Sequence, residues 1–91
     1  ILTNYFNSDT VSVGNLPITL SWSADLIEAI QDSVYIYDDV NLSNLVLKTA
    51  TLDNYDFSET TLGDYYWRIR SIDDIGNISN YSNTGHFYIS N

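Results

Sequence analysis

The chain is 91 residues long and carries twelve acidic residues against three basic ones, a formal net charge of −9 at pH 7. This charge disfavours nucleic acid and anionic membranes as partners, because their phosphates repel an acidic protein. The absence of cysteine excludes a disulfide framework and a thiolate metal site. No apolar run approaches the ~18 residues of a membrane-spanning helix, so no membrane insertion is expected. The length predicts a single domain over residues 1–91.

Short strands are expected along the first half of the chain. A weak strand at residues 11–13 precedes a clear one at 17–23, where Ile18, Leu20 and Trp22 alternate with hydroxyl-bearing side chains. Weaker runs follow at residues 34–37, 45–50 and 55–57. Clusters of turn-forming residues separate these runs. The alternation predicts strands with one buried face.

The segment from Asp25 to Gln31 departs from this pattern. Asp25 and Glu28 fit a capping box, and Leu26 and Ile30 would share one face of a helix. We therefore expect one or two helical turns between two strands.

The second half contains the other clear strand, at residues 65–71, and a weaker one at 86–89. We expect Trp22 and Trp67 to be buried neighbours from opposite sheets. The predicted core comprises Ile18, Leu20, Trp22, Leu62, Tyr65, Trp67, Ile69, Phe87 and Ile89. Short strands at a spacing of roughly ten residues, without strand–helix alternation, predict an all-β sandwich.

The order of residues 18–22, 62–70 and 73–82, followed by Phe87 and Ile89, resembles a fibronectin type III domain in the variant common in bacterial secreted and surface proteins. The resemblance covers about residues 11–90. It implies a seven-stranded antiparallel immunoglobulin-like β-sandwich. It also implies that the hydroxyl of Tyr65 bonds to backbone upstream. The longer apolar segment around Leu26 departs from the family pattern.

Catalytic chemistry finds little support in the sequence. The only histidine is His86, and no nucleophile pattern such as G-x-S-x-G accompanies it. A zinc site needs three or four nitrogen or sulfur ligands, and one such side chain is present. We predict a non-enzymatic domain without a cofactor, with His86 as a surface strand residue.

Acidic residues would gather at one pole if the strands run as in the sandwich. Two interpretations remain open: a loop-built calcium site, or a solvated acidic rim. No D-x-[DN]-x-[DN]-G loop is present, so we expect no obligatory calcium site. The residues concerned are Asp25, Glu28, Asp32, Asp73, Asp74 and Asn77.

Aromatic and cationic side chains are expected to face outward together from neighbouring strands. Tyrosine faces and arginine forks suit a platform for a sugar ring or a protein segment. Alternatively, they form cross-strand pairs that cover the sheet. The candidate binding residues are Tyr35, Tyr37, Tyr66, Arg68, Arg70 and Tyr88.

The function expected from these patterns is that of a spacer or accessory module of a larger secreted or cell-surface protein. The chain starts at Ile1 rather than Met, which favours a piece of a longer protein. Its partners would be neighbouring domains of the same chain, packed against Leu26, Ile27 and Ile30. The alternative function is a glycan- or protein-binding module that uses the outward tyrosine and arginine side chains.

Overall fold

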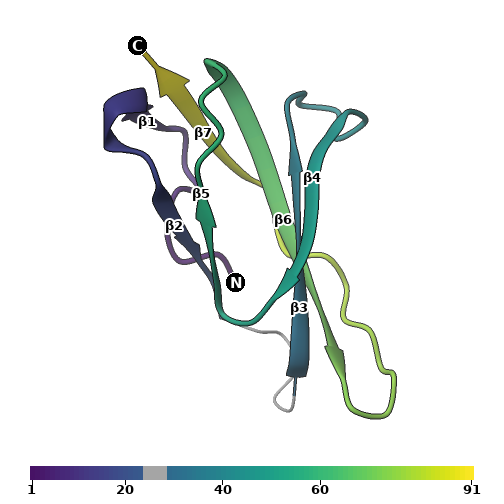
Figure 1. The fold of residues 1–91 in the computed structure, drawn as a ribbon. Coiled ribbons are helices and arrows are strands. Elements are labelled where there is room, and N and C mark those ends of the chain that lie inside the picture. Colours follow the sequence, from purple (N-terminus) through teal and green to yellow (C-terminus); the bar gives the residue numbers. More distant parts are fainter. Residues whose placement is uncertain (24–28) are drawn as a thin grey trace.

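The computed structural model describes residues 1–23 and 29–91, which fold into two layers of β-strands (Figure 1). Alternating apolar side chains form strands here because each strand has one face to bury. The described elements are β1 (Asp9–Ser12), the 3₁₀ helix η1 (Val13–Asn15), β2 (Ile18–Ser21), β3 (Ala29–Tyr37), β4 (Leu45–Thr51), β5 (Asn54–Phe57), β6 (Gly63–Asp73) and β7 (Gly85–Ser90). The all-β sandwich predicted from the sequence is confirmed at this level.

The strands divide unequally between the two layers. The larger sheet has the order β1-β7-β6-β3-β4, and the smaller one pairs β2 with β5. An isolated bridge between Leu2 and Trp22 adds the N-terminal segment to the smaller sheet. β1 runs parallel to β7, whereas the other pairs are antiparallel. The expectation of an entirely antiparallel sandwich was therefore wrong at β1.

The helical turn predicted for residues 25–31 is wrong where the structure describes that segment. Ala29 and Gln31 belong to β3 and pair with Asp73 and Ile72 of β6, with a register shift between them. Pairing with a long neighbouring strand overrides a weak local helix signal. Residues 24–28, which include Asp25, Leu26, Ile27 and Glu28, lie outside the described residues.

The core lies between the layers, and most of its aromatic pairs pack edge to face, whereas Tyr65 and Phe87 are stacked. Trp22 and Trp67 are buried neighbours with ring centroids 6.0 Å apart at 60°, as expected. The Tyr65 hydroxyl donates a hydrogen bond of 2.7 Å to the carbonyl of Thr61, also as expected. The prediction for Leu62 was wrong, because this side chain is 48% exposed just before β6. The other predicted core residues are buried: Ile18, Leu20, Trp22, Tyr65, Trp67, Ile69, Phe87 and Ile89.

Asp32 on β3 lies fully buried instead of on the predicted acidic pole. Its carboxylate accepts hydrogen bonds from Trp22 Nε1 (2.8 Å), Ser71 Oγ (2.6 Å) and the backbone N–H of Asp53 (3.2 Å). A buried carboxylate is tolerated when donors surround it in this way. Asp32 therefore joins the two layers from within.

Among the described residues, no helix is long and apolar enough to cross a membrane.

Candidate functional site

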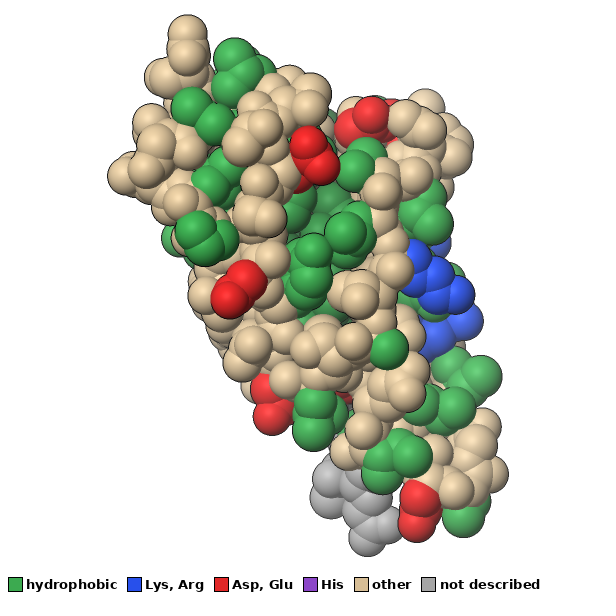
Figure 2. Space-filling model, viewed as in Figure 1, with side chains coloured by type: hydrophobic (Ala, Val, Ile, Leu, Met, Phe, Trp, Pro, Cys, Tyr) green, Lys and Arg blue, Asp and Glu red, His purple; other side chains and the backbone are tan. Residues whose placement is uncertain are grey.

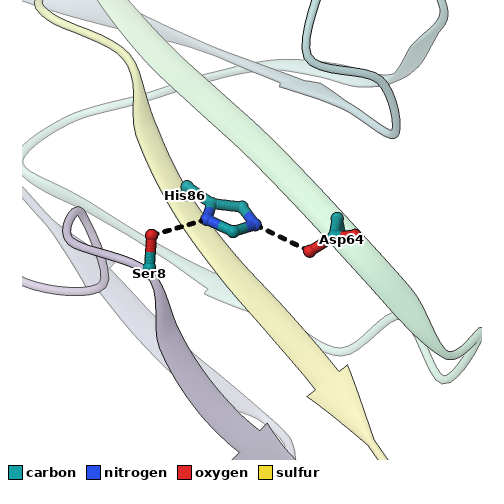
Figure 3. Close-up of polar contacts among 3 residues, drawn as sticks. All are labelled: Ser8, Asp64 and His86. Carbon is teal, nitrogen blue, oxygen red and sulfur yellow. Dashed lines mark hydrogen bonds and ion pairs between the residues drawn. The ribbon is translucent and has the colours of Figure 1, made fainter.

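Ser8, His86 and Asp64 form a hydrogen-bonded array on the outer face of the larger sheet (Figure 3). Ser8 Oγ lies 2.8 Å from Nδ1 of the imidazole, and Asp64 Oδ1 lies 2.8 Å from Nε2. The His86 and Asp64 side chains are 27% and 50% exposed. Solvent and small ions can therefore reach both groups.

Strand alternation and register place these side chains. His86 lies between buried Gly85 and Phe87 on β7, so its side chain points outward. It is paired with Tyr66 in the register of β6 and β7, which puts Asp64 on the diagonal from it. Tyr66 stacks on the imidazole with ring centroids 4.5 Å apart at 15°.

Ser8 reaches the imidazole from the segment that precedes β1. Its backbone N–H donates a 2.9 Å hydrogen bond to the carbonyl of His86, and its φ of 60° turns the chain toward β7. Ser8 and His86 are 78 positions apart in the sequence. Sequence reasoning missed Ser8 because no local pattern links residues at that separation.

The array has a defined proton arrangement when the imidazole is neutral. The Asp64 carboxylate only accepts, so Nε2 carries the proton and Nδ1 accepts from the Ser8 hydroxyl. Two kinds of chemistry fit these residue types. A serine beside a histidine base suits nucleophilic attack, and a neighbouring nitrogen and carboxylate oxygen suit a transition-metal ion.

Part of the predicted tyrosine and arginine platform comes together around Tyr81, a residue that was not among the predicted ones. The guanidinium carbons of Arg68 and Arg70 lie 3.6 and 3.8 Å from the centroid of the Tyr81 ring. Tyr35 packs edge-on against the same ring, with centroids 5.3 Å apart. Arg68 also donates to the hydroxyl of Tyr37 at 3.1 and 3.3 Å.

Tyr66 and Tyr88 take other positions. Tyr66 stacks on His86, and Tyr88 is 40% exposed on β7. The cluster around Tyr81 has the geometry of cross-strand pairs that cover a sheet. Its cations are held by tyrosine rings, and within the described part of the chain none pairs with a carboxylate.

At the predicted acidic pole, the carboxylate of Asp73 is already bonded by local donors. Asp73 accepts from the side-chain amide of Asn77 and from the backbone N–H groups of Asn77 and Ile75. These bonds, above all that from the Asn77 side chain, hold the pKa of Asp73 below its usual value. Asp74 is exposed beside it. Within residues 1–23 and 29–91, no group of three or more His, Cys, Asp or Glu side chains is placed to hold a metal ion.

Comparison with known proteins gives a likeness in fold. No protein-family model matches the chain, and no curated protein matches it. Among solved structures, the fold is similar to that of CopC from Methylosinus trichosporium OB3b, with a TM-score of 0.64 and 19% sequence identity. The similarity covers 99% of this chain and 92% of that one.

This likeness corrects the function expected from the sequence. The expected spacer or accessory module, and the glycan- or protein-binding module on the tyrosine and arginine face, are contradicted, because the similar structure is that of CopC, a copper-binding protein. That expectation rested on the sandwich pattern and on the absence of a catalytic pattern, and neither of these specifies what a domain binds.

Proposed function

We propose that this chain is a copper-binding β-sandwich protein and that His86 and Asp64 hold the ion. The observation that carries this proposal is the 2.8 Å separation of an imidazole nitrogen and a carboxylate oxygen on an exposed strand face. Among divalent first-row metals, Cu²⁺ binds such nitrogen and oxygen donors most tightly. The likeness in fold to CopC supports copper as the metal.

The surrounding residues would orient the imidazole for this role. When Nε2 serves the ion, the neutral ring carries its proton on Nδ1, and the Ser8 hydroxyl can accept that proton's hydrogen bond. Tyr66 covers one face of the ring and limits its rotation. Bound copper would supply positive charge beside Asp64 in a strongly acidic chain. Water would complete the coordination, since no third ligating side chain joins this pair within the described residues.

Calorimetric titration of the metal-free chain with Cu²⁺ tests the proposal. His86→Ala should abolish binding, and Asp64→Asn should weaken it by about tenfold or more. Asp74→Asn makes the same change of charge as Asp64→Asn at an exposed position elsewhere and should leave the affinity within about twofold. Electron paramagnetic resonance should show coupling to nitrogen in the parent chain. Copper binding that survives unchanged in the His86→Ala variant would contradict the assignment.

We also propose that the array of Ser8, His86 and Asp64 does not catalyse a reaction. His86 and Asp64 lie on an exposed strand face and Ser8 lies on the segment before β1, whereas a nucleophilic site needs its substrate held beside oxyanion donors. A fluorophosphonate probe labels activated serines and therefore tests this point. Stoichiometric labelling of Ser8 that is lost in the His86→Ala variant would establish a nucleophile instead.

We further propose that the sandwich has the fibronectin type III arrangement. The neighbouring order β7-β6-β3-β4 and the hydrogen bond from Tyr65 to Thr61 support this topology. The position of β4 is the discriminating feature, because a constant-type immunoglobulin domain carries its fourth strand in the A-B-E-D sheet, next to the counterpart of β5. A crystal structure with β4 paired to β5 would contradict the assignment.

We also propose that the protein acts outside the cytoplasm. The resemblance to domains of secreted and surface proteins supports it. Fractionation of cells that produce the natural full-length protein tests it, and recovery from the cytoplasm alone would overturn it.

A further inference from the structure

A groove opens between the two layers, on the side where β4 faces β5. Figure 2 shows hydrophobic side chains at the bottom of this hollow and acidic side chains at its upper rim. It consists of two adjoining cavities of about 390 and 160 Å³ that share Val46 and Glu59. Its apolar lining includes Leu47, Phe57 and Leu62. The exposure of Leu62, which contradicted its assignment to the core, is explained by this position.

Both strands beside the groove have a free edge within the described residues. β4 ends the larger sheet, and β5 ends the smaller one. The backbone groups on such an edge are available to a further strand. A bulge modifies the edge of β4: Leu45 and Leu47 pair with neighbouring residues of β3, and Val46 between them has no partner there. Val46 lines the groove instead.

The negative charge of the groove favours a basic partner. Asp38, Glu59 and Asp64 line it, and no basic side chain is among the described residues that do so. Tyr65 also lines the groove. Its pKa is raised first by burial and then by the negative charges of Glu59 and Asp38, so these charges act inside the groove. Lys48, the cation of β4, lies 5.3 Å above the Tyr35 ring in the cluster around Tyr81.

We infer that this groove binds an extended segment of a partner protein that carries apolar side chains, and then a lysine or arginine, at every second position. The segment would add as a strand to the free edge of β4, so that these alternate side chains all face the groove, the apolar ones over Val46 and Phe57 and the cation toward Glu59 and Asp38. A second copy of the chain is disfavoured, because it brings the same acidic rim and a charge of −9. The inference rests on Glu59 and Asp38 and does not require copper, although Asp64 of the proposed copper pair also lines the groove. It concerns a surface other than the cluster around Tyr81.

Peptide binding to the full 91-residue chain tests the inference. The probe is the heptapeptide Thr-Val-Thr-Val-Thr-Arg-Thr, whose second, fourth and sixth side chains share one face of a strand, and the charge control has Glu in place of Arg. A third peptide has the basic sequence with N-methyl groups on alternate residues, which removes the donors on one edge. The basic peptide should bind, weaken with added salt and shift the amide resonances of Val46 and Leu47. The acidic and N-methylated peptides should bind at least about tenfold more weakly.

Charge reversal inside and outside the groove completes the test. Glu59→Lys should weaken binding of the basic peptide by about tenfold, with Asp38→Lys as a second variant. Asp74→Lys changes the net charge equally in the turn after β6 and should have less than about a twofold effect. Equal losses in all variants would show non-specific attraction and overturn the inference. Absence of binding, or dimerisation of the chain through this groove in sedimentation experiments, would also overturn it.

Discussion

The buried carboxylate of Asp32 connects parts of the protein that are distant in the sequence. It receives donors from Trp22 after β2, from Ser71 on β6 and from the Asp53 backbone between β4 and β5. An apolar residue at this position would leave those donors without an acceptor. A buried polar group of this kind fixes the position of one layer relative to the other, because its hydrogen bonds form well in one arrangement only.

Replacement of Asp32 by alanine should lower the free energy of unfolding by about 3 to 5 kcal/mol, because two buried side-chain donors and one backbone N–H lose their partner. Urea unfolding followed by tryptophan fluorescence measures the change. The control is Asp56→Ala, which removes an exposed hydrogen bond to Thr19 and should cost less than about 1 kcal/mol. Equal costs for the two variants would show that the Asp32 contacts contribute no more than a surface bond.

Tyr65 should make the fold sensitive to alkali. Burial, and then the charges of Glu59 and Asp38, raise its pKa above the ordinary value of 10.0. The folded state therefore holds the phenol proton more tightly than the unfolded chain does. The stability that this group contributes is fully present below pH 10.0 and is lost as the pH rises through the raised pKa.

The measurement is the free energy of unfolding against pH for the parent, Tyr65→Phe and Tyr88→Phe chains. Tyr65→Phe should lower stability at neutral pH, because the hydrogen bond to Thr61 is lost, and should flatten the alkaline decline. Tyr88 is 40% exposed, and its replacement should leave the decline unchanged. An alkaline slope that persists in the Tyr65→Phe variant would contradict this account.

At the level of elements, the strands could be predicted from the sequence because each buries alternate side chains against one core. Ile18, Leu20 and Trp22 show this, since a shift by one residue would expose all three. The bulge at Val46 and the parallel pairing of β1 could not be predicted, because they depend on which strands become neighbours. His86 was placed correctly on a strand, but its contacts to Ser8 and Asp64 arise from chain crossings that leave no local pattern.

Gly85 in β7 shows how closely the elements approach one another. A Cβ atom there would lie 2.6 Å from Nε1 of Trp67 and 2.8 Å from a methyl carbon of Leu2. Trp67 cannot withdraw freely, because it is fully buried and Nε1 donates to the carbonyl of Tyr5. The glycine therefore lets the N-terminal segment pass over β7.

Gly85→Ala should destabilise the fold by about 1 to 3 kcal/mol through this overlap, as thermal and urea unfolding would show. Gly14→Ala is the matched control, since its Cβ would lie 3.9 Å from Oγ of Ser12, an ordinary contact, and it should cost little. Hydrogen exchange should locate the loss of protection in Gly85→Ala near Trp67 and Tyr5. A Gly85→Ala chain as stable as the Gly14→Ala chain would show that the N-terminal segment adapts without cost.

At the scale of the whole molecule, the charges are unevenly distributed. The three basic residues, Lys48, Arg68 and Arg70, all contact tyrosine rings on one face of the larger sheet. Among the described residues, many carboxylates lie in turns or line the groove, and those of Asp39 and Asp73 are bonded by local donors. Few attractive ion pairs between these described residues offset the repulsion among acidic groups.

This distribution predicts that salt stabilises the fold. Raising NaCl from about 20 to about 500 mM shortens the Debye length from about 20 Å to about 4 Å, which screens repulsion between carboxylates on different turns. The contacts between cations and tyrosine rings are short and change less. The melting temperature should rise by a few degrees, on the order of 1 kcal/mol for a domain of this size. Differential scanning calorimetry measures the effect.

Salts of divalent cations distinguish the screening of charge repulsion from the binding of an ion at a site. MgCl₂ and CaCl₂ at the same ionic strength should match NaCl, because Asp39 and Asp73 already accept bonds from neighbouring N–H groups and lack the close ligand spacing of a calcium loop. Stabilisation that grows with the logarithm of the Ca²⁺ concentration, and that is lost in the Asp73→Asn variant, would instead show a site. A melting temperature that falls as NaCl is added would show that attractive charge pairs dominate the folded state.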